Sequence, residues 1–256
     1  MTLRLWDAHV HLDFMRDPRE IAREAEALGF GMFAVTVTPQ GYQRVLPVLA
    51  DAPNIALGVG LHPWWAADGR CGPDDAALAA ELARTSRYVG EIGLDASPKH
   101  VPADSLPRQT AAFEQICSAC GETSEPGNPK ILSLHSVMAA ELTLDILERT
   151  GCLANCRCVF HWFTGSNEAL TRAVKAGCLF SVNEMMLHTR RGREYARQIP
   201  EDRLLLETDL PPGQDVPFRA ELIRDSLERT LGELEQIRGK VLRETIRKNA
   251  AELLDI

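Results

Sequence analysis

Side chains that bind metal ions recur at the ends of short apolar runs along the whole chain, and this rhythm restricts the fold more than any other feature. In chain order they are His9, His11, Glu91, His135, His161 and Asp209. A parallel β/α barrel carries its chemistry at the C-terminal ends of its strands. Imidazoles and carboxylates that converge there form a site for a divalent metal ion. The sequence therefore predicts a barrel with a metal-dependent hydrolytic site at its mouth.

Most of the apolar runs are continuously apolar rather than alternating, which is typical of parallel strands that are covered on both faces. We expect strands at Leu3–His11, Gly31–Thr38, Ile55–His62, Tyr88–Asp95, Lys130–His135, Cys158–Phe163, Cys178–Val182 and Arg203–Asp209. Between them, apolar residues three and four positions apart predict helices. We expect these helices at Pro18–Leu28, Ala76–Thr85, Ser105–Cys120, Ala139–Arg149, Glu168–Ala176, Arg190–Gln198, Pro217–Leu234 and Lys240–Leu254.

The alternation of strand and helix indicates βαβ units and an α/β fold with a parallel sheet. A single TIM-type (β/α) barrel typically needs about 250 residues, and this chain has 256 residues with no evident linker. We therefore expect one barrel domain that spans residues 1–256. The segments Ala66–Pro73 and Gly121–Pro129 are rich in turn-forming residues, and we expect loops there.

The chain is acidic, with 28 Lys and Arg against 36 Asp and Glu and a net charge of −8. This balance argues against a protein that coats long nucleic acid, because such binding depends on Lys and Arg. A nuclease that holds a short strand end remains possible, since bound metal ions supply local positive charge. The chain has no apolar run of roughly 18 residues and no N-terminal signal pattern. We expect a soluble cytoplasmic protein that does not bind membranes.

The chain has seven cysteines, an odd number, in an otherwise ordinary large domain. A disulfide scaffold is therefore not expected. Two groups lie close together in sequence, Cys117 with Cys120, and Cys152 with Cys156 and Cys158. Joining them into a four-ligand zinc site is possible, but nothing in the sequence supports it. We expect free thiols.

His9 and His11 are two residues apart on an expected strand, so both imidazoles point to the same side and can face one ion. Glu91 lies between glycines, which let the backbone come close to the site. A carboxylate in that place can bridge two ions that are roughly 3.5–4 Å apart. Asp209 can ligate the first ion and accept a proton from an attacking water.

His135 and His161 end neighbouring strands, so together with Glu91 they form a plausible site for a second ion. His62 follows the third strand and can contact the substrate or stabilise developing charge. Trp64 and Trp65 follow His62 after one proline, and Trp162 follows His161. These three rings serve either as barrel packing or as surfaces for nucleobases.

Other polar residues near these runs are harder to assign. Asp95 follows Glu91 by four residues and can either support the site or cap a loop. His100 and His188 have no comparable context, and we expect them to be surface or loop histidines. Arg190 and Arg191 can meet a phosphate or remain solvated.

The ordered set of motifs resembles the TatD-like metal-dependent deoxyribonucleases of the amidohydrolase-type barrel superfamily. The matching segments are Asp7-Ala-His-Val-His-Leu-Asp13, Gly60-Leu-His-Pro63, Gly90-Glu-Ile-Gly-Leu-Asp95, Leu134-His135-Ser136, His161-Trp-Phe-Thr-Gly165 and Glu207-Thr-Asp-Leu-Pro211. The resemblance implies a two-metal deoxyribonuclease that cleaves DNA, often from strand ends. It implies that His9, His11, Glu91 and Asp209 surround one ion, that Glu91, His135 and His161 surround the other, and that His62 acts at the substrate phosphate. The ligand types do not distinguish Mg, Mn and Zn.

Within that family, the segment Phe180–Leu187 is most similar to the branch found in the Qat antiphage defence system of bacteria. This similarity implies a role in antiviral defence and other Qat proteins as partners. One position departs from the family pattern, since Val137 follows the His135-Ser136 pair where members often carry Arg. Two other functions stay open: hydrolysis of a small amide, lactone or phosphoester, and a non-catalytic docking subunit of a defence complex.

Overall fold

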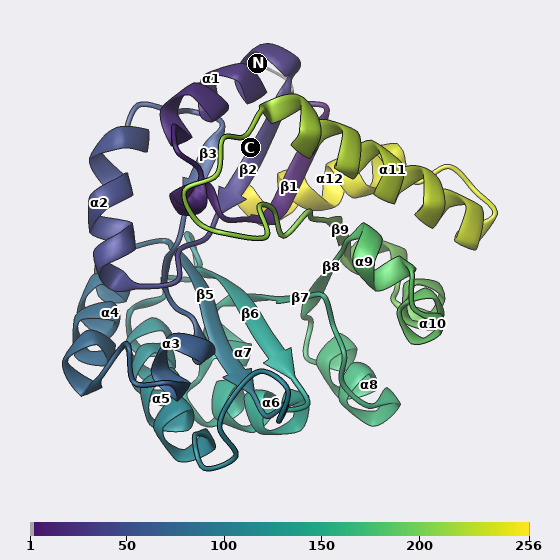
Figure 1. Ribbon diagram of the computed structural model, residues 1–256. Coiled ribbons are helices and arrows are strands. Elements are labelled where there is room, and N and C mark those ends of the chain that lie inside the picture. The colour runs from purple at the N-terminus through teal and green to yellow at the C-terminus, as the bar shows by residue number, and fades with distance from the viewer. Residues whose placement is uncertain (1–2, 256) are drawn as a thin grey trace.

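Parallel strands form the inside of the molecule and helices surround them in the computed structural model, which describes residues 3–255 (Figure 1). The strands are β1 (Leu5–Val10), β2 (Phe30–Ala34), β3 (Ile55–Leu57), β4 (Val59–Leu61), β5 (Tyr88–Asp95), β6 (Ile131–Val137), β7 (Arg157–His161), β8 (Leu179–Val182) and β9 (Leu204–Leu206). Each of the predicted runs overlaps at least one of these strands. The predicted parallel α/β fold is confirmed.

Strand pairing follows the chain order, in one sheet of β1-β2-β3 and another of β4 to β9. Backbone hydrogen bonds join the edges of the two sheets on both sides. Thr36 N, just beyond β2, donates to Gly90 O of β5 at 2.9 Å on one side, and Asp209 N, beyond β9, donates to His9 O of β1 at 2.9 Å on the other. The strands therefore curve round into a barrel whose first strand lies beside the segment that follows the last.

The predicted third strand, Ile55–His62, is divided into β3 and β4 at Gly58. β3 pairs with β2, whereas β4 pairs with β5. A Cβ at Gly58 would lie 2.7 Å from the Phe33 ring and 3.0 Å from Gly90 O. Only glycine allows the backbone to pass this close between its neighbours, so the change of pairing partner occurs there.

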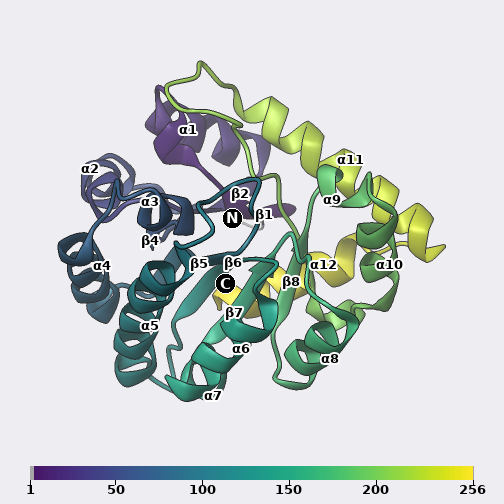
Figure 2. The ribbon, with the colours of Figure 1, turned by 60° about the horizontal axis from the view of Figure 1, so that its bottom comes forward.

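Helices connect the strands and cover the outside of the barrel. They are α1 (Pro18–Leu28), α2 (Pro39–Leu49), α3 (Pro63–Ala67), α4 (Pro73–Thr85), α5 (Leu106–Thr123), α6 (Ala140–Arg149), α7 (Cys152–Asn155), α8 (Asn167–Lys175), α9 (Glu184–Leu187), α10 (Arg190–Gln198), α11 (Ala220–Arg238) and α12 (Arg243–Leu254), with 3-10 turns η1 (Leu12–Phe14) and η2 (Glu201–Arg203). The bounds of α1 and α10 agree with the prediction. Figure 2 shows α4 and α5 on one side of the strands and α10 and α11 on the opposite side.

The sequence analysis did not predict the helix α2. Pro47 lies inside it, and proline usually interrupts a helix. Its start is well specified nonetheless. The Thr38 side chain caps it by accepting a hydrogen bond from Gly41 N at 3.0 Å, and Pro39 occupies the first turn, where proline is tolerated. Capping and tertiary packing on this face of the barrel therefore outweigh the unfavourable residue.

The last helix, α12, fastens the end of the chain to the barrel. Asn249 is buried and its side-chain amide donates to Glu201 O at 2.6 Å and to Leu204 O at 2.8 Å. These bonds satisfy carbonyls at the start of β9 and so help to fix the strand that leads to Asp209. No helix among residues 3–255 is both long enough and apolar enough to cross a membrane.

Candidate metal centre

The strand β1 and the residue that follows it direct His9 and His11 into the mouth of the barrel. His9 is fully buried, and its Nδ1 lies 2.7 Å from Ser133 Oγ on β6. This hydrogen bond orients the ring, so that Nε2 points to Glu91 Oε2 at 3.4 Å. His11 Nε2 lies 3.5 Å from the same oxygen. The two imidazoles therefore meet one oxygen of one carboxylate, as the period of the strand predicts.

The Glu91 side chain is the centre of the cluster. It is 1% exposed and its two oxygens face different histidines. Oε2 faces His9 and His11, whereas Oε1 faces His135 Nδ1 at 2.8 Å, His161 Nε2 at 2.9 Å and His62 Nε2 at 3.3 Å. Both oxygens of a buried carboxylate thus have their own set of nitrogen atoms, which is the arrangement that a bridging ligand requires.

A glycine two residues after Glu91 brings β6 close to β5. Gly93 has φ +145°, and a Cβ there would lie 2.0 Å from His135 O. Any other side chain would force the two strands apart. The glycine therefore allows His135 on β6 to approach Glu91 on β5 within hydrogen-bonding distance.

Asp209 completes the His9 and His11 side of the cluster. Its Oδ1 lies 3.3 Å from His11 Nε2 and 3.7 Å from His9 Nε2. Its backbone has φ +58°, a left-handed conformation that aspartate tolerates better than most residues. With 26% of its side chain exposed, compared with 8% or less for the Glu91 and histidine side chains, Asp209 is the ligand-type group most open to solvent.

The donor set and its unsatisfied nitrogen fit a divalent cation. His9 Nε2, which faces Glu91 Oε2, is buried and has no hydrogen-bond partner among residues 3–255, although buried polar atoms are normally paired. Nitrogen and oxygen atoms lie within 4.8 Å of one another in three groups: His9, His11 and Glu91; His9, His161 and Asp209; and His62, Glu91 and His135. Imidazole with carboxylate suits Zn and Mn, and Mg where oxygen ligands dominate.

The structure differs from the expected grouping at His62. The sequence placed His62 apart from the ligands, yet it forms a compact group with Glu91 and His135. Its Nδ1 accepts a hydrogen bond from Trp64 N at 3.1 Å. In a neutral imidazole the proton then lies on Nε2, and this nitrogen is the one that faces Glu91. His62 therefore presents an N–H donor to the centre rather than a free lone pair.

Charge in the cluster is set by burial and by the close contacts. Burial disfavours the charged form of Glu91, but His62, His161 and His9 outweigh it and hold the pKa of this carboxyl well below its usual range. Burial acts against protonation of His11 too, yet Asp209 and Glu91 raise its pKa to about 9. Burial lowers the pKa of His62 to about 4. At neutral pH the protein therefore holds an ionised Glu91 beside a neutral His62.

Asp95 does not face the cluster directly but holds one member of it. Its Oδ2 accepts hydrogen bonds from Trp64 Nε1 at 2.7 Å, His100 Nδ1 at 2.9 Å and His135 Nε2 at 3.1 Å. Burial opposes ionisation, but these bonds, led by that of His135, lower the pKa of Asp95 below its usual value. Of the two roles left open for Asp95, the structure shows support of the site.

The sequence analysis missed His100. It was expected to be a surface or loop histidine, and it does lie on the loop between β5 and α5 with 39% of its side chain exposed. The centroid of its ring also lies 5.2 Å from that of the Trp64 ring, so the two rings lie next to each other where both contact Asp95. Its only local signal is a spacing of five residues from Asp95, which does not specify a contact in a loop.

Two further carboxylates, one within β1 and one just after β9, accept hydrogen bonds from backbone, hydroxyl and side-chain amide groups. Asp7 accepts from His9 N and Thr208 N at 3.0 Å each and from Thr208 Oγ1 at 2.5 Å. Burial raises the pKa of Asp7 to about 8. Glu207 accepts from Asn183 Nδ2 at 2.8 Å, from Trp162 N at 3.2 Å and from Ser181 Oγ. The bond to Trp162 holds a residue whose φ of +37° is unusual for a bulky side chain.

The remaining predicted residues lie at the edge of the cluster or outside it. Arg191 donates to Gly165 O and Tyr195 Oη, whereas Arg190 and His188 are exposed. Val137 pairs with Asp95 in the ladder of β5 and β6, so this position lies beside the centre. All seven cysteines are unpaired, and Cys152 Sγ donates to Cys117 O.

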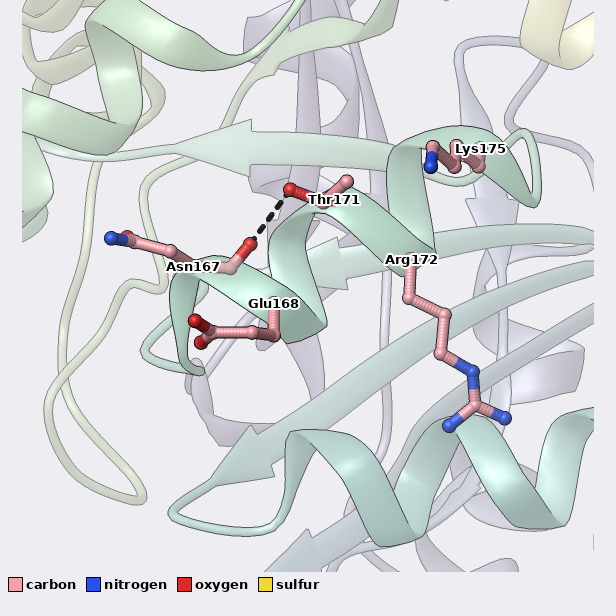
Figure 3. Close-up of a pocket in the computed structure, with 5 residues that line it drawn as sticks. All are labelled: Asn167, Glu168, Thr171, Arg172 and Lys175. Carbon is pink, nitrogen blue, oxygen red and sulfur yellow. Dashed lines mark hydrogen bonds between the residues drawn. The ribbon is translucent and has the colours of Figure 1, made fainter.

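A surface pocket on α8 contains none of the ligand-type residues. It is lined by Asn167, Glu168, Thr171, Arg172 and Lys175 (Figure 3). Arg172 there is held by carboxylates of α6, with Asp145 Oδ1 at 2.6 Å and Glu148 Oε2 at 2.7 Å. Its positive charge is therefore already compensated, and the candidate chemistry stays with the cluster at the barrel mouth.

The sequence matches a family model and several known proteins. A family model described as TatD related DNase matches residues 6–255. The uncharacterized metal-dependent hydrolase YcfH of Escherichia coli K12 is 28% identical over 238 residues, covering 90% of this chain and 86% of that protein. Deoxyribonuclease Tat-D of Schizosaccharomyces pombe is 30% identical over 218 residues, covering 79% and 66% respectively.

Two further comparisons concern a named exonuclease and the fold. The 3'-5' ssDNA/RNA exonuclease TatD of Erwinia tasmaniensis is 30% identical over 219 residues, covering 81% of this chain and 80% of that protein. The crystal structure of YjjV, a TatD homologue from Escherichia coli K12, covers 100% of both chains with a TM-score of 0.79 and 21% identity. This likeness confirms the predicted TIM-type barrel.

Proposed function

The chain belongs to the TatD-related DNase family, and we propose that it is a metal-dependent phosphodiesterase that degrades DNA from strand ends. One observation carries the proposal. The five buried histidines divide between the two oxygens of Glu91, with two at Oε2 and three at Oε1. A shared carboxylate between two sets of ligands is typical of sites that cleave phosphodiesters with two metal ions. Relatives named as deoxyribonuclease and exonuclease support the choice of substrate.

The proposed centre holds two divalent ions, Mg, Mn or Zn. Its first site consists of His9, His11, Glu91 and Asp209, and its second of Glu91, His135 and His161. Such ions lower the pKa of water and stabilise charge on phosphoryl oxygens. We assign residues 1–256 to one domain that carries this centre.

The protein's own groups then have distinct tasks. Asp209 is ionised, because His11 outweighs the effect of burial and lowers the pKa of the carboxyl to about 2. Being the most exposed carboxylate of the centre, it orients the attacking water and accepts its proton. His62 is neutral and carries its proton on Nε2, since Nδ1 accepts from Trp64 N. It donates a hydrogen bond to an oxygen of the substrate phosphate.

The test uses metal-stripped protein with end-labelled single- and double-stranded DNA, to which Mg, Mn or Zn is added separately. We expect metal-dependent shortening of the labelled strand, with polarity shown by the labelled end. Glu91→Gln should lower the rate by at least about a hundredfold, because the ions lose their common ligand. Glu125→Gln, at an exposed loop position, is the matched control and should retain the rate.

Other results would redirect the assignment. Turnover of a small amide, lactone or phosphoester without cleavage of DNA under any metal would replace the nuclease proposal with a small-molecule hydrolase. One ion per chain in the active protein, measured by elemental analysis, would contradict the two-metal centre. A protein that binds no metal and cleaves nothing would support a docking role.

We further propose that the enzyme acts in the bacterial cytoplasm as the nuclease of an antiphage defence system, together with Qat partner proteins. The support is the similarity of Phe180–Leu187 to that branch of the family. The test is phage plating on bacteria that carry the complete system. Glu91→Gln should abolish protection while partner binding persists. Equal protection by the variant would separate this chain's catalysis from defence.

A further inference from the structure

A surface cleft lies between the first turns of α8 and α10, at the same end of the barrel as the metal centre. The helix α8 follows β7, and α10 follows β8 after the short α9, so both helices begin at the C-terminal ends of their strands. The two helices lie side by side (Figure 2). Residues at the start of each helix line the cleft, and these include Ser166, Asn167, Glu168, Arg190 and Arg191.

Arg191 is fixed in the cleft by groups that carry no charge. Its Nε donates to Tyr195 Oη at 2.7 Å, and its Nη2 donates to Gly165 O at 2.6 Å. Tyr195 is itself buried, and its hydroxyl donates to the same carbonyl oxygen at 2.5 Å. A guanidinium group has five N–H donors, so three of them remain for a ligand. The positive charge of Arg191 is oriented by these contacts but not neutralised by them.

The charge balance of α10 differs between its first turn and the rest of the helix. Arg193 pairs with a glutamate of α11, and Arg197 pairs with a glutamate that also lines the cleft. Arg190 and Arg191 are exposed and form no ion pair among residues 3–255. The cleft also contains the exposed Glu168, at the start of α8 (Figure 3). Two cations therefore face one carboxylate, in a chain whose net charge is −8.

The segment that follows β7 connects the cleft to the metal centre. His161, a proposed metal ligand, is the last residue of β7, and Gly165, which accepts from Arg191, follows four residues later. Four residues span at most about 14 Å. A Cβ at Gly165 would lie 2.4 Å from the Phe163 ring and 2.7 Å from Ala140 Cβ, so close packing holds this segment in place. Phosphates of one strand recur roughly every 3.4 Å along a duplex axis, so the cleft lies a few nucleotides from the centre.

We propose that this cleft binds an internucleotide phosphate of the DNA strand held at the metal centre, a few nucleotides away from the cleaved bond, with Arg190 and Arg191 as its donors. This inference rests on the proposed nuclease function and adds a second binding site for the same strand. Arginine suits this ligand because its planar fork matches two oxygens of a phosphate. A phosphate contact carries no sequence information, so the cleft favours a polynucleotide over a small phosphoester without selecting a sequence.

The test measures binding of a labelled single strand by fluorescence anisotropy in Mg²⁺, with phosphorothioate linkages near the cleaved end to slow hydrolysis. A matched series of strands carries one neutral methylphosphonate in place of one internal phosphate, at successive positions. We expect one position of the series to weaken binding by the wild type about tenfold. The same position should have little effect in Arg190→Gln or Arg191→Gln, because phosphate and arginine act as one pair and their losses are not additive.

The two arginine variants have a second readout, the salt dependence of binding. Each should weaken binding of the unsubstituted strand and lower the slope of log K against log salt by up to about 0.7, the value for one phosphate contact on a single strand. Arg190 makes no hydrogen bond to residues 3–255, so Arg190→Gln removes no contact of the fold. Glu168→Gln should tighten binding, because it removes the negative charge from the cleft. Arg23→Gln, at an exposed position of α1, removes an equal charge elsewhere and should bind the whole series as the wild type does.

A wild type for which no single methylphosphonate matters more than the others would overturn the phosphate site. Equal losses in Arg190→Gln, Arg191→Gln and Arg23→Gln would overturn it too, since the effect would then be that of net charge. A protein that shows the position-specific loss through both arginines but cleaves no DNA contradicts the nuclease function alone. Cleavage of strands below KM at the wild-type rate by both arginine variants contradicts the phosphate site alone.

Discussion

Asp95 allows a quantitative test of how the centre is held together, through the replacement Asp95→Asn. The carboxylate is fully buried, and Oδ2 accepts from Trp64, His100 and His135 while Oδ1 accepts from Ser97 N at 2.8 Å. An asparagine has the same shape, but one of its two terminal atoms is an NH₂ donor. In either orientation that donor must oppose an existing donor.

The magnitude follows from the less damaging orientation, in which the NH₂ group faces Ser97 N and the oxygen stays with the other three donors. A buried donor without a partner costs about 1–3 kcal/mol. Loss of the negative charge weakens the three remaining bonds, each by up to about 1 kcal/mol where the partner is protonated. We expect a total destabilisation of about 2–4 kcal/mol. For a chain of this size the melting temperature should fall by about 5–15 °C.

The second consequence concerns the metal. Partners that orient a ligand imidazole typically change metal affinity by about 10–100-fold, and in Asp95→Asn the carboxylate partner of His135 becomes a neutral amide oxygen. Urea unfolding with a chelator measures the first effect, and competition with a chromophoric chelator measures the second. Asp104→Asn, on the same loop with 84% of its side chain exposed, is the control. Unchanged metal affinity in Asp95→Asn would refute the role of Asp95 in orienting His135.

Three further predictions follow from the same geometry. His62→Ala should lower kcat by about a hundredfold, the typical effect of removing one charge-stabilising donor, without changing the number of bound ions; loss of an ion in elemental analysis would instead make His62 a ligand. The pKa of His11 is raised to about 9, so this histidine is protonated in the metal-free protein at pH 7 and must lose its proton to bind an ion. Metal affinity should therefore rise up to about tenfold per pH unit from pH 7 to 9, and calorimetric titration that shows no such rise contradicts this protonation. Removal of metal from a protein held at a free ion concentration a hundred times Kd should reduce stability by about 2.7 kcal/mol, which scanning calorimetry with and without chelator would detect as a fall of about 5–10 °C.

The sequence was sufficient to predict the convergence of the ligand-type residues. C-terminal ends of parallel strands meet at one end of a barrel, so a polar residue that follows an apolar run is placed there whatever the details of packing. The alternation of side chains on β1 likewise predicts that His9 and His11 share one side. Both inferences depend only on backbone periodicity, which the apolar pattern records directly.

The sequence was not sufficient where the result depends on side-chain rotation or on loops. The division of the histidines between Oε1 and Oε2 of Glu91 depends on ring orientations, and the His62 orientation depends on a single backbone donor, Trp64 N. The approach of His100 to Asp95 depends on the path of residues 96–105. The helix α2 contains Pro47, a residue that argues against a helix in a sequence pattern, and capping with tertiary packing stabilises it nonetheless.

The carboxylates at the strand ends show which structural feature separates a candidate ligand from a structural group. Asp7 lies within β1 and Glu207 follows β9, whereas Glu91 lies within β5 and Asp209 follows β9, so the strands alone do not separate the two pairs. Asp7 and Glu207, however, each accept several hydrogen bonds from backbone or neutral side-chain donors, and these bonds join β1 and β7 to the segment that follows β9. Among residues 3–255, Glu91 and Asp209 accept from no backbone N–H, and imidazoles alone surround them. A carboxylate whose lone pairs already meet fixed donors has little capacity left for a cation, whereas one that faces only imidazoles needs a cation or a proton to balance it. Asp7 and Glu207 thus stabilise the barrel, whereas Glu91 and Asp209 keep a negative charge that can bind a cation.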